Sequence, residues 1–149
     1  MNHPATPTRR VAVIALAMAL IVAGCSRSDP ERELRDTVTR MAGAIEARRP
    51  ADLLEHVADD FTRESGAFGK QELQRILAGV LLRNEKIVVT AAVTDVSVQG
   101  ARASARIRVL ASGGSGWLPE RGQTWDITTH WRREGSTWRV FNAEWQEGF

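Results

Sequence analysis

The chain has 149 residues, a formal net charge of +2, 43% hydrophobic residues and 26% charged residues. This size and composition suit one globular domain and exclude a collagen-like chain, a coiled coil and a wholly disordered chain. A pI near 9.3 suggests nucleic-acid binding. However, Arg9 and Arg10 lie in a segment with the pattern of an export leader. Without these two, the other basic side chains equal the 18 acidic ones in number. We therefore expect no nucleic-acid partner.

Residues 1–24 have the three parts of a secretory signal peptide. Arg9 and Arg10 supply positive charge, residues 11–22 are apolar, and the small residues Ala23 and Gly24 follow. An apolar helix of about 14 residues would be only about 21 Å long. A bilayer core is about 30 Å thick. We interpret the segment as a cleaved signal rather than a permanent transmembrane helix.

The end of this signal resembles the bacterial lipobox, in the sequence Val22-Ala23-Gly24-Cys25. The resemblance implies that the thiol of Cys25 is lipidated and that acyl chains anchor the mature protein. Cys25 is the only cysteine, so an intrachain disulfide is impossible. Ser26 follows it instead of aspartate. In lipoproteins of this kind that implies the periplasmic face of the outer membrane, with the inner membrane as the alternative.

We divide the mature chain into the lipidated cysteine with a short tether, residues 25–30, and one domain, residues 31–149. The first half of the domain has helical periodicity. Asp29 followed by Pro30 is typical of a helix start, and Pro50 ends that helix or opens the next. A short second helix is predicted to run to Phe61, and a third over residues 70–83. Their apolar faces are predicted to be Leu34, Val38, Met41 and Ile45, then Leu53, Leu54, Val57 and Phe61, then Leu73, Ile76, Leu77, Val80 and Leu81.

The second half of the domain has the alternating pattern of β-strands. Strands are predicted over residues 87–98, 101–109, 125–131 and 137–145. Helices followed by a strand meander predict an α+β fold: a cone of three N-terminal helices packed on a curved antiparallel sheet of four or more strands.

The last hairpin, from His130 to Val140, resembles the terminal hairpin of nuclear-transport-factor-2-like domains, including SnoaL-like and ketosteroid-isomerase-like members. The order of predicted elements is similar too, including the acidic pair Asp59-Asp60 before Phe61. The resemblance implies a cone-shaped fold enclosing a pocket, and a homodimer formed through the sheet face. That fold serves isomerases, dehydratases, cyclases, binding proteins and assembly modules, so it does not by itself define a function.

The register of this hairpin decides which side chains enter the cone. A three-residue loop, Arg133-Glu134-Gly135, would place Asp126, His130, Trp138, Asn142 and Glu144 on one face of the sheet. A two-residue loop would shift the pairing by one residue and mix the faces. We prefer the first register, which gathers polar side chains beside an aromatic wall.

Candidate site residues follow from that register. His130 is the catalytic candidate because an imidazole can both accept and donate a proton near neutral pH, and Asp126 or Glu144 would assist it. Trp138, Asn142 and His130 are the ligand-binding candidates. The same face could instead be the solvated outside of the sheet or a subunit interface. His56, Asp59 and Asp60 are too few for a metal site without a second histidine, so we predict no metal and no cofactor.

Three functions remain open at this point. The preferred one is non-catalytic binding of a small apolar or amphipathic ligand, or of an envelope protein, by a membrane-anchored periplasmic lipoprotein. The alternative is a small lyase, isomerase or hydrolase that uses His130 with Asp126 or Glu144 in the cone pocket. The chain has no tyrosine, which argues against an isomerase that holds an enolate with a tyrosine hydroxyl. A scaffold role is the third.

Overall fold

The computed structural model describes residues 28–64, 66, 68–114 and 121–147. The predicted signal peptide and Cys25 lie outside these residues. Helix α2 (Pro30–Glu46) begins where the sequence predicts, because Asp29 accepts a hydrogen bond from the backbone N–H of Glu31 at 3.0 Å and Pro30 occupies the first turn. Its inner face buries Leu34, Val38 and Ile45. No helix in the described part is long and apolar enough to cross a membrane.

The prediction that a short second helix reaches Phe61 is wrong. Helix α3 (Pro50–Leu54) ends early, and strand β1 (Val57–Arg63) follows it directly. Val57 and Phe61 are both buried in this strand. They are four residues apart, and residues an even number of positions apart point to the same face of a strand. Asp59 and Asp60 consequently lie on a strand and face solvent, not at the end of a helix.

The remaining elements match the predicted order. Helix α4 (Lys70–Arg83) is followed by strands β2 (Lys86–Gln99), β3 (Arg102–Gly114), β4 (Arg121–Glu134) and β5 (Thr137–Glu147). They form a five-stranded sheet in the order β1-β5-β4-β3-β2. Strands β2 to β5 pair antiparallel, whereas β1 pairs with β5 in parallel. The expectation of a wholly antiparallel sheet is therefore corrected to a mixed sheet.

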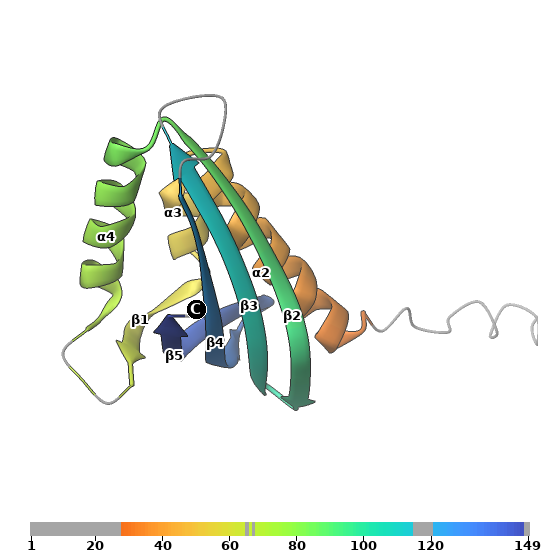
Figure 1. Ribbon diagram of the computed structural model, residues 1–149. Helices are drawn as coiled ribbons and strands as arrows, with labels where there is room; N and C mark the ends of the chain where they lie inside the picture. The colour runs from red at the N-terminus through yellow and green to blue at the C-terminus, as the bar shows by residue number, and fades with distance from the viewer. Residues whose placement is uncertain (1–27, 65, 67, 115–120, 148–149) are drawn as a thin grey trace, which may run out of the picture.

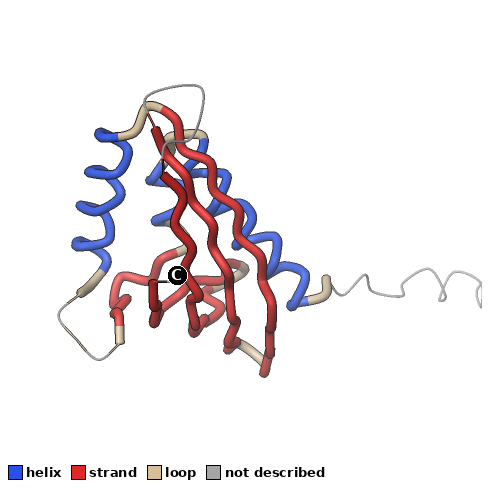
Figure 2. Tube along the Cα trace, viewed as in Figure 1, coloured by secondary structure: helices blue, strands red, loops and turns tan. Residues whose placement is uncertain are grey.

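The long strands β2, β3 and β4 curve across one side of the molecule, and α2 and α3 cover their concave face (Figure 1). Helix α4 stands on the opposite side of the cone from α2, as the path of the chain in Figure 2 shows. The core lies between α2, β1 and the sheet. Its largest fully buried side chains are Trp131, Trp138, Leu34 and Val57.

The β4–β5 hairpin has a two-residue loop, so the prediction of a three-residue loop is wrong. Glu134 pairs with Thr137, and Gly135 adopts a φ of +62°, as the first loop residue of a type II′ turn requires. A bulge then inserts Phe141, because His130 pairs with Asn142 while Trp131 pairs with Val140.

The bulge resets the register by one residue. Beyond it, Ala143 and Trp145 share a face with Thr129 and Ile127, as the preferred register predicts, although the pairs themselves differ from those of that register. Between the loop and the bulge, Trp138 and Val140 instead turn into the core with Trp131. Trp138 therefore shares no face with His130, contrary to the sequence prediction.

Candidate functional site

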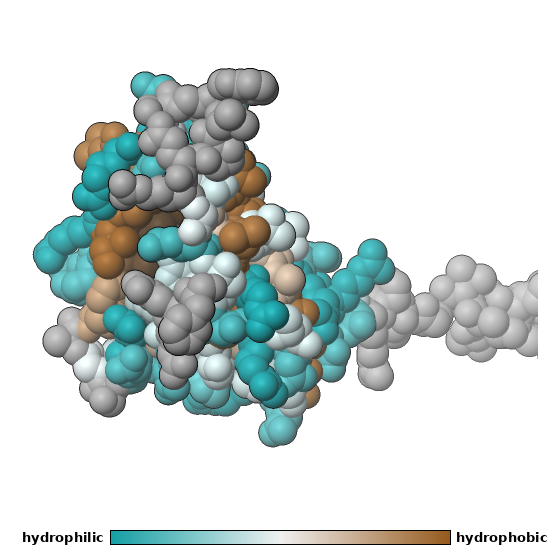
Figure 3. Space-filling model, in the orientation of Figure 1, coloured by the Kyte–Doolittle hydropathy of each residue, from teal (hydrophilic) through white to brown (hydrophobic). Residues whose placement is uncertain are grey.

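The interior of the cone contains an apolar cavity, which we call the inner cavity. It has a volume of about 300 Å³ and lies between α2, β1, α4 and the concave face of the sheet. Representative lining residues are Val38, Leu73, Leu77, Val109, Ile127 and Trp145. No ionisable side chain of the described chain lines it. Hydrophobic surface gathers in the hollow beside α4 (Figure 3). The inner cavity is therefore suited to an apolar group.

Among the described residues that line the inner cavity, Thr129 alone has a hydroxyl, and this hydroxyl is already engaged. Its hydroxyl donates to the carbonyl oxygen of Ala105 at 2.9 Å and accepts from the indole Nε1 of Trp131 at 2.7 Å. A hydroxyl has one proton to donate, so this group has none left for a ligand. The inner cavity thus offers shape and apolar contact rather than a group for proton transfer.

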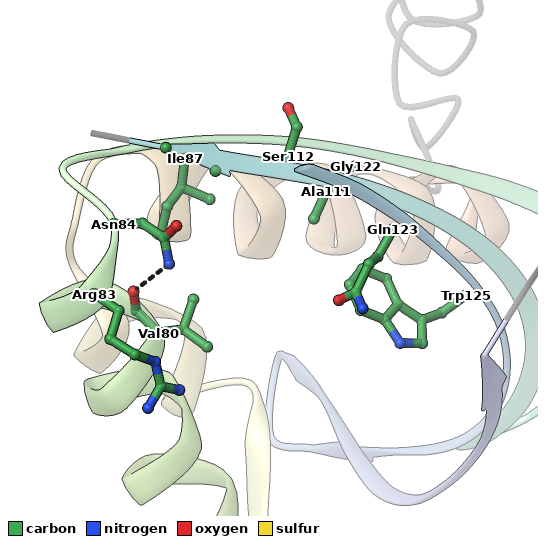
Figure 4. Close-up of a pocket in the computed structure, with 11 residues that line it drawn as sticks. Val80, Arg83, Asn84, Ile87, Ala111, Ser112, Gly122, Gln123 and Trp125 are labelled. Carbon is green, nitrogen blue, oxygen red and sulfur yellow. Dashed lines mark hydrogen bonds between the residues drawn. The ribbon is translucent and has the colours of Figure 1, made fainter. Parts of the chain in front are cut away.

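A second cavity, which we call the end cavity, adjoins the inner one toward the C-terminal end of α4. Its volume is about 760 Å³. The two cavities share a continuous wall on strands β2, β3 and β4, where successive inward-facing residues line first the inner and then the end cavity. These pairs are Val89 and Ile87, Val109 and Ala111, and Ile127 and Trp125. Here the lining becomes mixed, with Arg83, Asn84 and Gln123 among apolar groups. Gln123 and Trp125 extend from the sheet on the side facing α4 (Figure 4).

Helix α4 forms one wall of both cavities and buries little of its own surface. Leu81 is its one buried residue, and Leu82 is 86% exposed. At its N-terminus, the carboxylate of Glu72 accepts from the backbone N–H of Gly69 at 3.0 Å, and Lys70 pairs with Asp59 at 2.8 Å. The helix is therefore held mainly by its ends, and its middle leaves room for the cavities.

Arg48 holds the C-terminal end of α4. Its guanidinium donates to the carbonyl oxygens of Leu81 at 2.6 Å, Asn84 at 2.7 Å and Glu85 at 3.2 Å. These contacts satisfy carbonyls that a helix end leaves unpaired. Asn84 also lies so close to Gly113 that a Cβ there would come within 2.5 Å of its Oδ1. The end of α4 is thus fixed to the end of α2 and to strand β3.

Replacing Arg48 with methionine is expected to lower the free energy of unfolding by about 1–2 kcal/mol, because charge-assisted hydrogen bonds to the end of α4 are lost. Amide hydrogen exchange in the last turn of α4 should accelerate as well. Urea denaturation and exchange mass spectrometry measure the two effects. Arg49 is the matched control, since it makes only an exposed pair with Asp52. Equal results for Arg48→Met and Arg49→Met would contradict this role.

The catalytic candidates His130, Asp126 and Glu144 lie on the convex face of the sheet, not in the cone. Asp126 and Glu144 are exposed, and His130 is half-buried. Their expected position in the cone pocket is therefore corrected. The cause is the strict alternation of β4, which turns Ile127, Thr129 and Trp131 inward and the residues between them outward.

Asp126 is engaged by arginine rather than by histidine. Arg108 donates to its two carboxylate oxygens at 2.8 and 3.2 Å. These hydrogen bonds hold the pKa of Asp126 below its usual value, so this carboxylate stays ionised at neutral pH. His130 instead lies near the ring of Phe141, with 6.3 Å between ring centroids. It lines a shallow hollow of about 300 Å³ on the convex face with Ser97, Arg102 and Ser104.

The two other ligand-binding candidates have structural roles. Trp138 is buried beneath the guanidinium of Arg133, 4.7 Å from its ring centroid, and Arg133 pairs with Glu33 on α2. Asn142 donates to the carbonyl oxygens of Glu64 at 2.9 Å and Thr62 at 3.2 Å, which ties β5 to β1. Neither lines the inner or the end cavity.

The acidic residues of β1 form ion pairs. Arg132 donates to both carboxylate oxygens of Asp60, at 2.6 and 2.9 Å, and thereby lowers the pKa of Asp60. The ring Nδ1 of His56 lies 3.3 Å from the carbonyl oxygen of Trp138. Within the described ranges, no group of three or more His, Cys, Asp or Glu residues could hold a metal ion.

The residues that line the cavities were predicted as core or not singled out. Leu73, Leu77 and Val80 have the spacing of one apolar helix face, so the sequence does not distinguish them from residues of a fully packed helix. The four tryptophans of the last hairpin offered a partial signal. Trp125 lines the end cavity, and Trp131 and Trp145 line the inner one.

The fold is that of the nuclear-transport-factor-2-like proteins, as comparison with solved structures shows. No family profile and no curated protein sequence matches the chain.

The similar solved structures include proteins of different function. A nuclear-transport-factor-2-like protein of unknown function from Pseudomonas putida is 21% identical, with a TM-score of 0.65 over 80% of this chain and 87% of that one. A protein assigned as a scytalone dehydratase from Novosphingobium aromaticivorans is 13% identical, with a TM-score of 0.67 over 80% and 85%. A hexachlorocyclohexane dehydrochlorinase from Novosphingobium barchaimii is 13% identical, with a TM-score of 0.62 over 80% and 87%. Such identities establish the fold alone. The fold by itself does not define a function.

Proposed function

We propose that this protein is a lipid-anchored periplasmic protein whose cone binds a small apolar or amphipathic ligand without catalysing a reaction. The observation that carries the proposal is the apolar lining of the inner cavity, in which the hydroxyl of Thr129 is already used. The ionisable side chains first considered for catalysis lie on the other face of the sheet. A ligand in the cone would therefore contact surface suited to retention rather than to proton transfer.

Fluorescence of N-phenyl-1-naphthylamine, an apolar probe, tests ligand binding directly. We use the mature domain from Ser26 onward, because the core extends from Leu34 to Trp145 and truncation removes none of it. The proposal predicts saturable enhancement with one probe per chain. Linear, unsaturable enhancement, or none, would contradict binding in the cone.

The lipid anchor is tested separately in cells. Cys25→Ser is expected to abolish incorporation of labelled palmitate and to release the protein from membranes, because the lipobox cysteine supplies the thioether. The matched control is Ser26→Ala, which leaves the cysteine intact and should stay acylated. A Cys25→Ser variant that still fractionates with membranes and carries labelled acyl chains would overturn the anchor. Density fractionation of the wild type distinguishes the outer membrane, which we propose, from the inner.

A further inference from the structure

The inner and end cavities differ in polarity, and this difference would orient an amphipathic molecule that spans both. The inner cavity is lined by apolar side chains and the engaged Thr129. The polar side chains Arg83, Asn84, Ser112 and Gln123 line the end cavity. An amphipathic molecule would therefore place its apolar part in the cone and its polar head toward the C-terminal end of α4.

The charge in the end cavity is positive. Arg83 is the one ionisable residue lining either cavity in the described part of the chain. It is exposed and has no ion pair with any described residue. Its guanidinium lies over Gly79, where an added Cβ would be 3.5 Å away, at ordinary van der Waals contact.

The negative end of the α4 dipole would ordinarily oppose an anion at this place. Here Arg48 donates to three carbonyl oxygens at that end, and Asn84 Nδ2 donates to the carbonyl of Val80 at 2.9 Å. These contacts offset the partial negative charge of the helix terminus. The helix terminus therefore opposes an anion beside Arg83 less strongly, and the guanidinium of Arg83 is available to bind one.

The volume limits the apolar part. At about 30 Å³ for each group the size of a water molecule, a cavity of 300 Å³ holds about ten such groups. This is the lower end of ligand cavities in proteins. A medium-length alkyl chain or a compact ring system fits the inner cavity, whereas the tails of a diacyl lipid exceed it.

We propose that the ligand is an amphipathic monoanion such as a medium-chain carboxylic acid, with its apolar part in the inner cavity and its anionic head at Arg83. This inference rests on the proposed function and adds the chemistry of the head group. The cation would supply discrimination between head groups, while the apolar wall would supply most of the affinity.

Displacement of N-phenyl-1-naphthylamine by decanoate, 1-decanol and decylammonium tests the head group, since these three share one alkyl chain. The wild type should bind decanoate about fivefold more tightly than decanol, the scale of an exposed ion pair, and decylammonium most weakly. Arg83→Gln should remove the advantage of decanoate and leave decanol unchanged. The control Arg106→Gln removes the same charge from the convex face and should preserve the order.

The other possible results of the displacement experiment separate the head-group inference from the proposed function. Equal affinities for decanoate and decanol, preference for decylammonium, or an unchanged order in Arg83→Gln would overturn the anionic head group. Saturable probe binding that none of the three compounds displaces would also overturn it, while the proposed function stands. Failure of the probe itself to bind would contradict the proposed function and, with it, this inference.

Discussion

Replacing Val109 with tryptophan is expected to weaken binding of N-phenyl-1-naphthylamine at least about tenfold. Val109 is half-buried on the concave face of β3 and lines the inner cavity. The added indole would occupy space that the ligand needs. Because it enters an existing cavity, the free energy of unfolding should change by only about 1 kcal/mol, the low end for an enlarged core residue. Fluorescence titration and urea denaturation of the same preparation measure both.

Leu110 offers a matched control at the next position of the strand. It is 51% exposed on the convex face, so Leu110→Trp adds the same ring outside the cone. This variant should bind the probe as the wild type does. If Val109→Trp binds normally, or if the two variants lose binding equally, the probe occupies another site and the cone is not the binding cavity.

Replacing Trp131 with alanine is expected to lower the free energy of unfolding by about 3–5 kcal/mol. Trp131 is 1% exposed and belongs to the core formed by α2, β1 and the sheet. The substitution removes the ring, leaves a cavity and breaks the hydrogen bond from its Nε1 to the hydroxyl of Thr129. A loss of this size is a large share of a typical domain stability of about 5–15 kcal/mol.

Trp131→Phe separates packing from hydrogen bonding. It retains most of the ring and loses the indole N–H, so we expect a smaller loss of about 1 kcal/mol. This variant also keeps the test informative if Trp131→Ala does not fold. Urea denaturation gives both values. An alanine variant destabilised by less than about 1 kcal/mol would show that Trp131 is not central to the core.

The helices and long strands could be predicted because their signals are local. Asp29 and Pro30 define the start of α2, and the alternation of Trp125, Ile127, Thr129 and Trp131 defines the inward face of β4. Strand β1 could not be distinguished in this way, because Val57 and Phe61 suit one face of a helix and one face of a strand equally. Its parallel pairing with β5 joins residues far apart in the chain.

The separation of Trp138 from His130 depends on the loop and the bulge of the last hairpin, and neither has a clear signal in the sequence. The two-residue loop pairs Trp138 with Arg133, which turns Trp138 into the core and separates it from His130. The insertion of Phe141 then returns Asn142 to the face of His130. The cavity residues were missed for a different reason. Leu77 and Val109 look like core residues, and they line a cavity because α4, held by Arg48 and Glu72 at its two ends, stands off the sheet.

Native mass spectrometry of the domain from Ser26 onward, purified from the periplasm of its own cells, would show whether the cone holds a ligand. We expect a co-purifying small molecule with one copy per chain, retained by the wild type and by Leu110→Trp but absent from Val109→Trp. A mass of the bare chain for all three proteins, as monomer or dimer, would contradict a ligand-holding cone and favour a role in binding another protein.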